Sequence, residues 1–268
     1  MEKVHVLDHG YVALVETWGS DERIVEAARM STGKGFLGWG GAVCPSCWEN
    51  GLLSSHDDLY KGPEQHAVGR GCSVCKGTGK TIGDEKLLRF LYENKHATPF
   101  EMGGLVIEVQ APIFVFREWH RHRTQSYNEL SARYTPLPDV NYIPTVERLL
   151  MHSTSNKQAA RASGAHELTI EQAHGFRASL EKSYAAAQDL YQSALAAGVP
   201  KELARVHLPV GRYSRMRASA NLRNWLAFLT LRMATAAQWE IRQYANEVCT
   251  LVAQAFPRTH ELFAKVAA

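Results

Sequence analysis

Four of the five cysteines form two CxxC pairs, and this pattern constrains the fold more than any other feature of the chain. Cys44 and Cys47 make the first pair, Cys72 and Cys75 make the second, and 24 residues lie between the pairs. Two intervening residues let both sulfurs of a pair reach the same metal, so the four thiolates predict one zinc site. Four cysteine ligands leave no open position for a substrate, and we therefore expect a structural zinc.

The segment around these cysteines, residues 32–83, is predicted to be an inserted, loop-rich module. Eleven glycines lie between Thr32 and Gly83, and the apolar residues follow no helical or strand period. Such a segment has too little core of its own, so metal binding would supply its folding free energy. The CxxCxGxG run from Cys72 to Gly79 resembles the zinc knuckles of J-protein chaperones, which supports zinc and says little about function.

Two alternatives to this assignment stay open at the level of the sequence. His56 or His66 could replace one thiolate as a ligand. A zinc ribbon could also bind nucleic acid or a partner protein, although the basic residues of the module would make only a weak patch for a polyanion. These basic residues are Lys34, Lys61, Arg70, Lys76 and Lys80.

The composition is that of an ordinary soluble protein. Hydrophobic residues make up 45% and charged residues 21% of the 268, which excludes a wholly disordered, collagen-like or disulfide-dense chain. A net charge of +3 neither requires nucleic acid nor excludes an anionic small molecule. The first residues lack the basic start and apolar run of a signal peptide, and no apolar stretch approaches about 18 residues. We therefore expect a cytoplasmic protein without a membrane span.

The apolar pattern predicts an α+β fold, with an antiparallel-sheet core, flanking helices, a helix-rich C-terminal half and the small zinc-binding insert. Ser20 and Asp21 are typical of a helix N-terminus. Strands are expected within residues 3–18, at 105–109 and at 212–220. Helices are expected at 20–30, 84–92, 112–120, 167–197, 201–207, 222–254 and 258–266.

The densest chemistry lies between Arg117 and Tyr134, where four arginines and two histidines accompany only two acids. The guanidinium group of arginine can donate two parallel hydrogen bonds to a phosphate or carboxylate group, and such bidentate contacts fix the orientation of the ligand. A solvated basic face is the alternative interpretation. The run follows an apolar helix and contains Trp119 and Tyr127, which makes a plain surface less convincing.

Within this run, Arg121-His122-Arg123, seven further residues and then Ser131 resemble the RHRx7S signature of flavin-dependent thymidylate synthases. Other segments that resemble the family lie in order along the chain, at 27–31, 96–101, 204–209 and 221–241. The resemblance covers nearly all of the chain except residues 32–83. We therefore expect one synthase domain over residues 1–268, with residues 32–83 inserted into it.

The resemblance implies a reaction and a set of partners. Such enzymes methylate dUMP to dTMP, with 5,10-methylenetetrahydrofolate as carbon donor, NADPH as reductant and FAD as hydride carrier. They are homotetramers whose active sites are shared between subunits, and they use no cysteine nucleophile. The lone Cys249 lies in a helical pattern and is expected to be packed. Neither a membrane nor nucleic acid is expected as a partner.

Site residues follow from the positions that match the family's motifs. Arg232 is the expected catalytic residue, pairing with the uracil and stabilising its ionised ring, and His96 is placed on the folate side. The residues expected to bind dUMP are Glu118, Trp119, His120, Arg121, Glu129, Leu130, Ser131, Ala132, Arg133, Arg205 and Arg232. The residues expected to bind the flavin are Ser31, Thr98, Arg121, His122, Arg123, Glu129, Asn221, Leu222 and Arg223.

Arg232 also stands out without the resemblance. It lies on or beside an apolar helical stripe, and a buried guanidinium is costly unless it meets an anion. The alternative to a ligand is a buried salt bridge to Glu240 or another acid.

Two positions depart from the family. Glu118 stands where members often have Gln, and we expect Arg117 or Arg121 to pair with it, or a hydrogen bond that Gln would also make. Ala227 stands where some members have a flavin-contacting Asn.

Two interpretations compete with a synthase. A zinc-ribbon protein that binds nucleic acid would show steep salt dependence and no bound flavin. An inactive family member could instead use its zinc module as a docking surface. A flavin spectrum bleached by NADPH would favour the enzyme over both.

Overall fold

The structure is a computed structural model, and it describes residues 2–40, 44, 46, 47, 72, 75, 83–152 and 166–267. The chain divides into two compact units. The first contains Met1–Thr17, Leu105–Ala220 and Asn224–Leu251. The second contains Trp18–Gly104, Asn221–Arg223 and Val252–Ala268. No helix among the described residues combines the length and the hydropathy that a membrane crossing needs.

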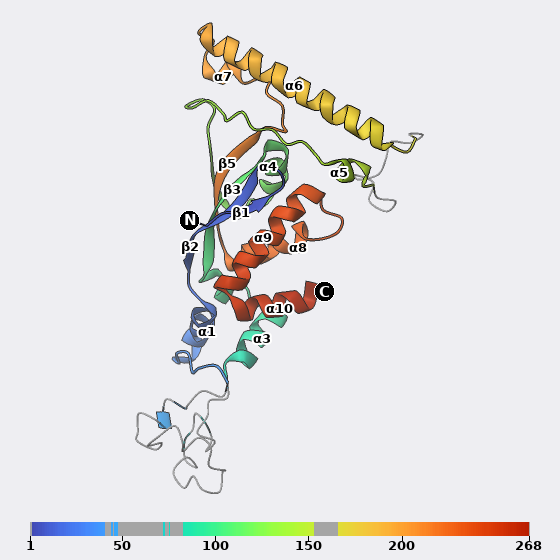
Figure 1. The fold of residues 1–268 in the computed structure, drawn as a ribbon. Helices are drawn as coiled ribbons and strands as arrows, with labels where there is room; N and C mark the ends of the chain where they lie inside the picture. Colours follow the sequence, from blue (N-terminus) through green and yellow to red (C-terminus); the bar gives the residue numbers. More distant parts are fainter. Residues whose placement is uncertain are drawn as a thin grey trace. The chain divides into compact units, whose positions relative to one another are not determined.

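A five-stranded antiparallel sheet forms the centre of the first unit, as the sequence predicts (Figure 1). Its strands follow the order β1-β2-β3-β5-β4. In β3 every second residue from Leu105 to Ala111 is fully buried, which is the alternation that one covered face requires. The strands are β1 (Val4–Val6), β2 (Gly10–Trp18), β3 (Gly104–Pro112), β4 (Ser126–Glu129) and β5 (Tyr213–Asn221).

Strand β4 was not predicted, because residues 121–134 are polar and show no apolar alternation. It pairs with β5 in a register that sets Ser126 opposite Ser219 and Glu129 opposite Met216. Ser126 and Glu129 are exposed, so this edge strand buries few side chains and leaves little pattern in the sequence. Its backbone pairing is what orders the middle of the arginine-rich run.

The core of the first unit lies between the sheet and its helices. The indole of Trp119 packs on Phe228 with ring centroids 4.6 Å apart. Trp225 donates from Nε1 to the Leu105 carbonyl over 3.1 Å, and both tryptophans are fully buried. The helices assigned to this unit, in whole or for most of their length, are α4 (Ile113–Trp119), α5 (Val146–Leu150), α6 (Ile170–Ala196), α7 (Lys201–Ala204), α8 (Leu222–Arg232) and α9 (Trp239–Ala255).

Two predicted helices of this unit have different bounds. The helix expected over 222–254 is interrupted, because α8 ends at Arg232 and α9 begins at Trp239. The break contains no Pro or Gly, so the sequence carried no local signal for it. The helix expected over 201–207 ends at Ala204, where the Arg205 backbone caps it.

The long helix α6 confirms the prediction for 167–197 but is mostly exposed. Thr169 caps it in a capping box with Gln172. Within α6, all of which the structure describes, only Ala173 and Tyr191 are buried. The side chains of Phe176 and Leu190 are half exposed, so much of the apolar face predicted for α6 is not covered by the described part of this chain.

The second unit is a cluster of short helices. Ser20 caps α1 as predicted, accepting from the Arg23 amide. The buried Asp21 accepts from the amides of Arg258 and Thr259, at the N-terminus of α10, over 2.8 and 3.1 Å. The elements are α1 (Asp21–Arg29), η1 (Met30–Thr32), α3 (Glu85–Glu93), η4 (Thr98–Glu101) and α10 (Pro257–Ala267). Their shared core contains Ile24, Val25, Leu88, Leu91, Phe100 and Phe263.

Candidate active site and metal centre

The ends of α4 and α8 meet through the guanidinium of Arg232. Its Nε donates to Nε2 of His122 over 2.8 Å. Nη1 donates to the Glu118 carboxylate and Nη2 to the Glu118 backbone carbonyl, each over 2.9 Å. The Arg232 side chain is only 15% exposed, so these contacts hold a largely buried cation at the predicted position.

Burial and charge fix the protonation of His122. Burial, and then the positive charge of Arg232, lower its pKa to about 4, while the negative charge of Glu118 partly opposes this. His122 is therefore neutral near pH 7 and can accept the Arg232 hydrogen bond. The phenol of Tyr127 donates to the carbonyls of Trp119 and His122, which fixes the loop between α4 and β4.

These contacts correct the expectation for Glu118. Its partner is Arg232, because the last turn of α4 brings Glu118 to the end of α8. Arg232 thus forms a salt bridge to an acid, as the alternative interpretation stated, but this acid is not Glu240, which accepts hydrogen bonds from Arg148 and Tyr142. Sequence spacing could not identify this pairing, since Glu118 and Arg232 are 114 positions apart.

Trp119 and His120 occupy different environments beside this group. Trp119 is fully buried, its indole donates to Gln125 over 3.1 Å, and its carbonyl accepts from Tyr127. The His120 ring is part-buried and lies edge-on to Tyr127, with centroids 4.8 Å apart. Trp119 is therefore a core residue, and its burial does not support the direct dUMP contact expected from the sequence.

A second group of predicted residues lies after β4. The Ser131 hydroxyl accepts from the Arg133 amide over 3.3 Å, and the Ser131 carbonyl accepts from the Tyr134 amide. Arg133 pairs with Glu202 of α7 over 3.3 Å, and Arg205 caps the same helix. The structure thus brings the Ser131–Arg133 turn and the Arg205 segment together within the first unit.

Strand β4 connects these two groups along the chain. Glu129 is its last residue, and the next residue, Leu130, donates from its amide to the Arg215 carbonyl over 2.7 Å. Ala132 is buried beneath the turn.

Arg121 and Arg123 are exposed, and within the described part of the chain neither forms an ion pair. Exposed guanidinium groups of this kind fit an anionic ligand.

The other predicted flavin and folate residues lie in the second unit. Arg223 pairs with Glu101 of η4, whose first residue is Thr98, and the Leu222 amide donates to Gly103 over 2.7 Å. Thr98 and the 221–223 segment are therefore held together. Ser31, on η1, and His96, which stacks near Phe90, are exposed. Asn221 is the last residue of β5.

Sequence reasoning missed an open hollow in the second unit. Its volume is about 450 Å³. It lies beside η1, and two exposed methionines, Met30 and Met102, help to line it. Met30 directly precedes Ser31, and Met102 directly follows η4. Both methionines are thus next to segments predicted to bind the flavin, and this proximity in sequence could have indicated the hollow. The remaining lining residues are Gly19, Arg23, Glu26 and Ala27.

The four paired cysteines converge as predicted. All four sulfurs lie within 4.8 Å of one another, with Cys44 to Cys72 at 3.8 Å and Cys47 to Cys75 at 3.5 Å. A zinc–sulfur bond of about 2.3 Å places tetrahedral sulfurs about 3.8 Å apart, so the donor set fits zinc. A disulfide needs about 2.05 Å between the sulfurs, and these four cysteines form no disulfide. His56 and His66 lie outside the described residues, as do Lys61, Arg70, Lys76 and Lys80.

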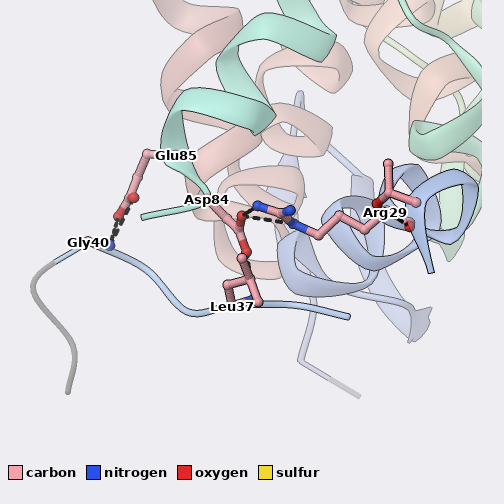
Figure 2. Close-up of polar contacts among 6 residues, drawn as sticks. Arg29, Leu37, Gly40, Asp84 and Glu85 are labelled. Atoms are coloured by element: carbon pink, nitrogen blue, oxygen red, sulfur yellow. Dashed lines mark hydrogen bonds and ion pairs between the residues drawn. The ribbon is translucent and has the colours of Figure 1, made fainter. Parts of the chain in front are cut away.

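The two ends of the segment that carries these cysteines are clamped together (Figure 2). The fully buried carboxylate of Asp84 pairs with Arg29 and accepts from the Leu37 amide over 2.8 Å. Glu85 accepts from the Gly40 amide over 2.7 and 2.9 Å. Residues 37–40 and 84–85 therefore meet beside the C-terminus of α1, immediately before η1 and Ser31.

Comparison with known proteins identifies the family. The family described as thymidylate synthase complementing protein matches residues 13–258. The flavin-dependent thymidylate synthase of Thermosipho africanus is 34% identical over 262 residues, covering 98% of this chain and 94% of its own length. The chain belongs to the flavin-dependent thymidylate synthase family. The predicted resemblance is therefore confirmed.

Two further comparisons support this assignment. The enzyme of Anaplasma marginale is 32% identical over 98% of this chain and 74% of its own length. The UMP/dUMP methylase PolB of Streptomyces cacaoi, solved with 5-Br dUMP, has a TM-score of 0.70 at 29% identity. That comparison covers 98% of this chain and 97% of PolB, so the predicted α+β fold is confirmed.

Proposed function

We propose that this protein is an FAD-dependent thymidylate synthase, which methylates dUMP to dTMP with 5,10-methylenetetrahydrofolate as carbon donor and NADPH as reductant. The observation that carries the proposal is the bond between Arg232 and His122 of the RHR triplet, in a chain that matches the family over residues 13–258. The name of the solved relative, a UMP/dUMP methylase, supports a uridine nucleotide as substrate.

The proposed dUMP site combines the two groups of the first unit. Ser131, Arg133 and Arg205 would hold the phosphate, because a hydroxyl and two guanidinium groups belong to the turn after β4 and the segment beside it. Glu129, Leu130 and Ala132 would contribute through their backbone and shape the same turn. Arg121 and the backbone of residues 118–120 would continue the site toward Arg232.

Arg232 is proposed as the catalytic residue. A guanidinium held in a part-buried site can stabilise the negative charge that a uracil ring develops as its C5 becomes nucleophilic. Neutral His122 holds Nε of Arg232, so a ligand would approach the terminal nitrogens, which contact Glu118 in the free protein. The bond to His122 orients the guanidinium before a ligand binds, which supports a role for Arg232 in the chemistry.

The proposed flavin contacts begin with the RHR triplet. The exposed guanidinium groups of Arg121 and Arg123 fit the diphosphate of FAD in charge and donor number. Further contacts are proposed from Ser31, Thr98, His122, Glu129, Asn221, Leu222 and Arg223, with His96 on the folate side. When bound, FAD would take a hydride from NADPH and deliver it for the new methyl group.

The four cysteines are proposed to bind one structural zinc. Their separations fit tetrahedral thiolate coordination, and three of the four are fully or almost fully buried. We propose residues 32–83 as the inserted zinc-binding module of a synthase domain over residues 1–268. We also propose a cytoplasmic homotetramer with shared active sites, which the family and the exposed apolar side chains of α6 support.

A spectrum of the purified protein tests the proposal. The holoprotein should show a flavin absorbance that NADPH bleaches and air restores. A protein that binds no flavin when FAD is supplied, while its four-cysteine centre is intact, would contradict the proposed function. It would instead favour the zinc-ribbon interpretation, which steep salt-dependent binding of DNA would support.

A further inference from the structure

Glu118 neutralises the arginine that the proposed function assigns to the nucleotide base. Its carboxylate accepts from Nη1 of Arg232 over 2.9 Å. The Arg232 side chain is 15% exposed and that of Glu118 is 42% exposed. A ligand that presents negative charge to Arg232 therefore meets a carboxylate already in contact with the guanidinium.

The carboxylate is not needed to hold Arg232 in place. Nε is bound by His122, and Nη2 is bound by the backbone carbonyl of Glu118, which no side-chain substitution removes. Two of the three guanidinium nitrogens thus keep their partners without it. The Glu118 side chain could therefore turn away while Arg232 keeps its position, and its 42% exposure means that water can solvate it there.

Charge determines whether the Glu118 carboxylate remains in contact with Arg232 when a ligand binds. Glu118 and Arg232 form an ion pair without net charge, which stabilises a developing negative charge far less than a free guanidinium does. An anionic ring edge and the Glu118 carboxylate would also repel each other at hydrogen-bond distance. An occupant of the proposed base site has to take the place of this carboxylate.

We propose that Glu118 is a displaceable counter-ion, which pairs with Arg232 in the free protein and is replaced by the electronegative edge of the uracil base. This inference rests on the proposed function, since it requires the base to lie at Arg232. It makes Glu118 a specificity residue: a ligand with the sugar phosphate alone leaves the ion pair intact, and a ligand with a uracil edge must break it.

The test compares Glu118→Gln with the wild-type protein by calorimetry. Gln keeps the size and the hydrogen-bond acceptor and removes only the charge. We expect dUMP to bind about threefold to tenfold more tightly to this variant, because a weaker contact has to be broken. We expect 2-deoxyribose 5-phosphate, which lacks the base, to bind both proteins equally. Glu118→Ala should shift dUMP affinity in the same direction.

Glu108→Gln provides the matched control. Glu108 of β3 pairs with the exposed Arg217 of β5, so this change removes one carboxylate from an Arg–Glu pair elsewhere in the sheet. Unchanged or weaker dUMP binding by Glu118→Gln would overturn the inference, and so would an equal gain for both ligands, which would indicate a general field effect. Failure of all these proteins, the wild type included, to bind dUMP would overturn the proposed function as well.

Discussion

The guanidinium of Arg232 and the imidazole of His122 are joined by a 2.8 Å hydrogen bond, although 110 positions separate them in the chain. This contact places one residue of the RHR triplet against the end of α8 within a single unit. It also helps to explain the lowered pKa of His122, since a cation beside a buried imidazole disfavours its protonation further. The chemical assignments for the first unit depend on this arrangement.

Arg232→Ala should abolish synthesis of dTMP while the protein still folds. The expected loss in turnover is several orders of magnitude, because no other described cation replaces the guanidinium beside His122. Circular dichroism and the flavin spectrum should remain close to those of the wild type. Near-normal turnover by a folded, flavin-loaded variant would remove Arg232 from the chemistry.

His122 should titrate with a pKa of about 4, measured by NMR of its imidazole. Arg232→Ala should raise this pKa, since a neighbouring positive charge is lost, and Glu118→Gln should lower it, since a negative charge is lost. Shifts of the same sign in both variants would contradict the contacts described for this group.

The pKa of His122 also predicts how stability depends on pH. Because the folded value lies below the usual 6.5, the unfolded chain takes up the proton first as pH falls. The His122 contribution to the free energy of unfolding should therefore decrease between about pH 6.5 and 4. Replacing His122 by Gln should flatten this part of the stability profile, as measured by urea denaturation.

Purified protein should contain about one zinc per chain by elemental analysis, as a single four-thiolate centre requires. Cys47→Ser should lose most of it, because a buried hydroxyl does not replace a thiolate ligand. Cys249→Ser is the matched control, since Cys249 lies in α9 outside the cluster. Equal zinc content in both variants would exclude the proposed centre.

Asp84→Asn should destabilise the second unit by about 2–4 kcal/mol, because it leaves the mostly buried Arg29 without its counter-ion. The introduced carboxamide could still accept from the Leu37 amide, so the loss would isolate the ion pair. Glu26→Gln, which breaks an exposed pair, should cost less than about 1 kcal/mol. Equal thermal stabilities of the two variants would show that the clamp in Figure 2 contributes little.

Sequence predicted those elements that have strong local signals. Ser20 caps α1, and the alternation of Leu105, Ile107 and Val109 marks β3. Each of these signals lies within a few residues of the element that it specifies. The four-cysteine cluster belongs to the same class, since metal coordination requires a particular spacing.

Contacts between distant segments could not be predicted in this way. β4 exists because its backbone pairs with β5, about 90 positions later, and its side chains remain mostly exposed. The partner of Arg232 depends on how α4 and α8 end, and charge alone could not choose between Glu118 and Glu240. The apolar residues of α6 were correctly placed on a helix, but helical spacing does not specify what covers them.

The formation of dTMP tests the central claim most directly. The protein is supplied with FAD, dUMP, 5,10-methylenetetrahydrofolate and NADPH, and nucleotides are separated by chromatography. We expect dTMP to accumulate, and omission of either the folate or NADPH to prevent it. Absence of dTMP from flavin-loaded, zinc-containing protein under these conditions would contradict the account.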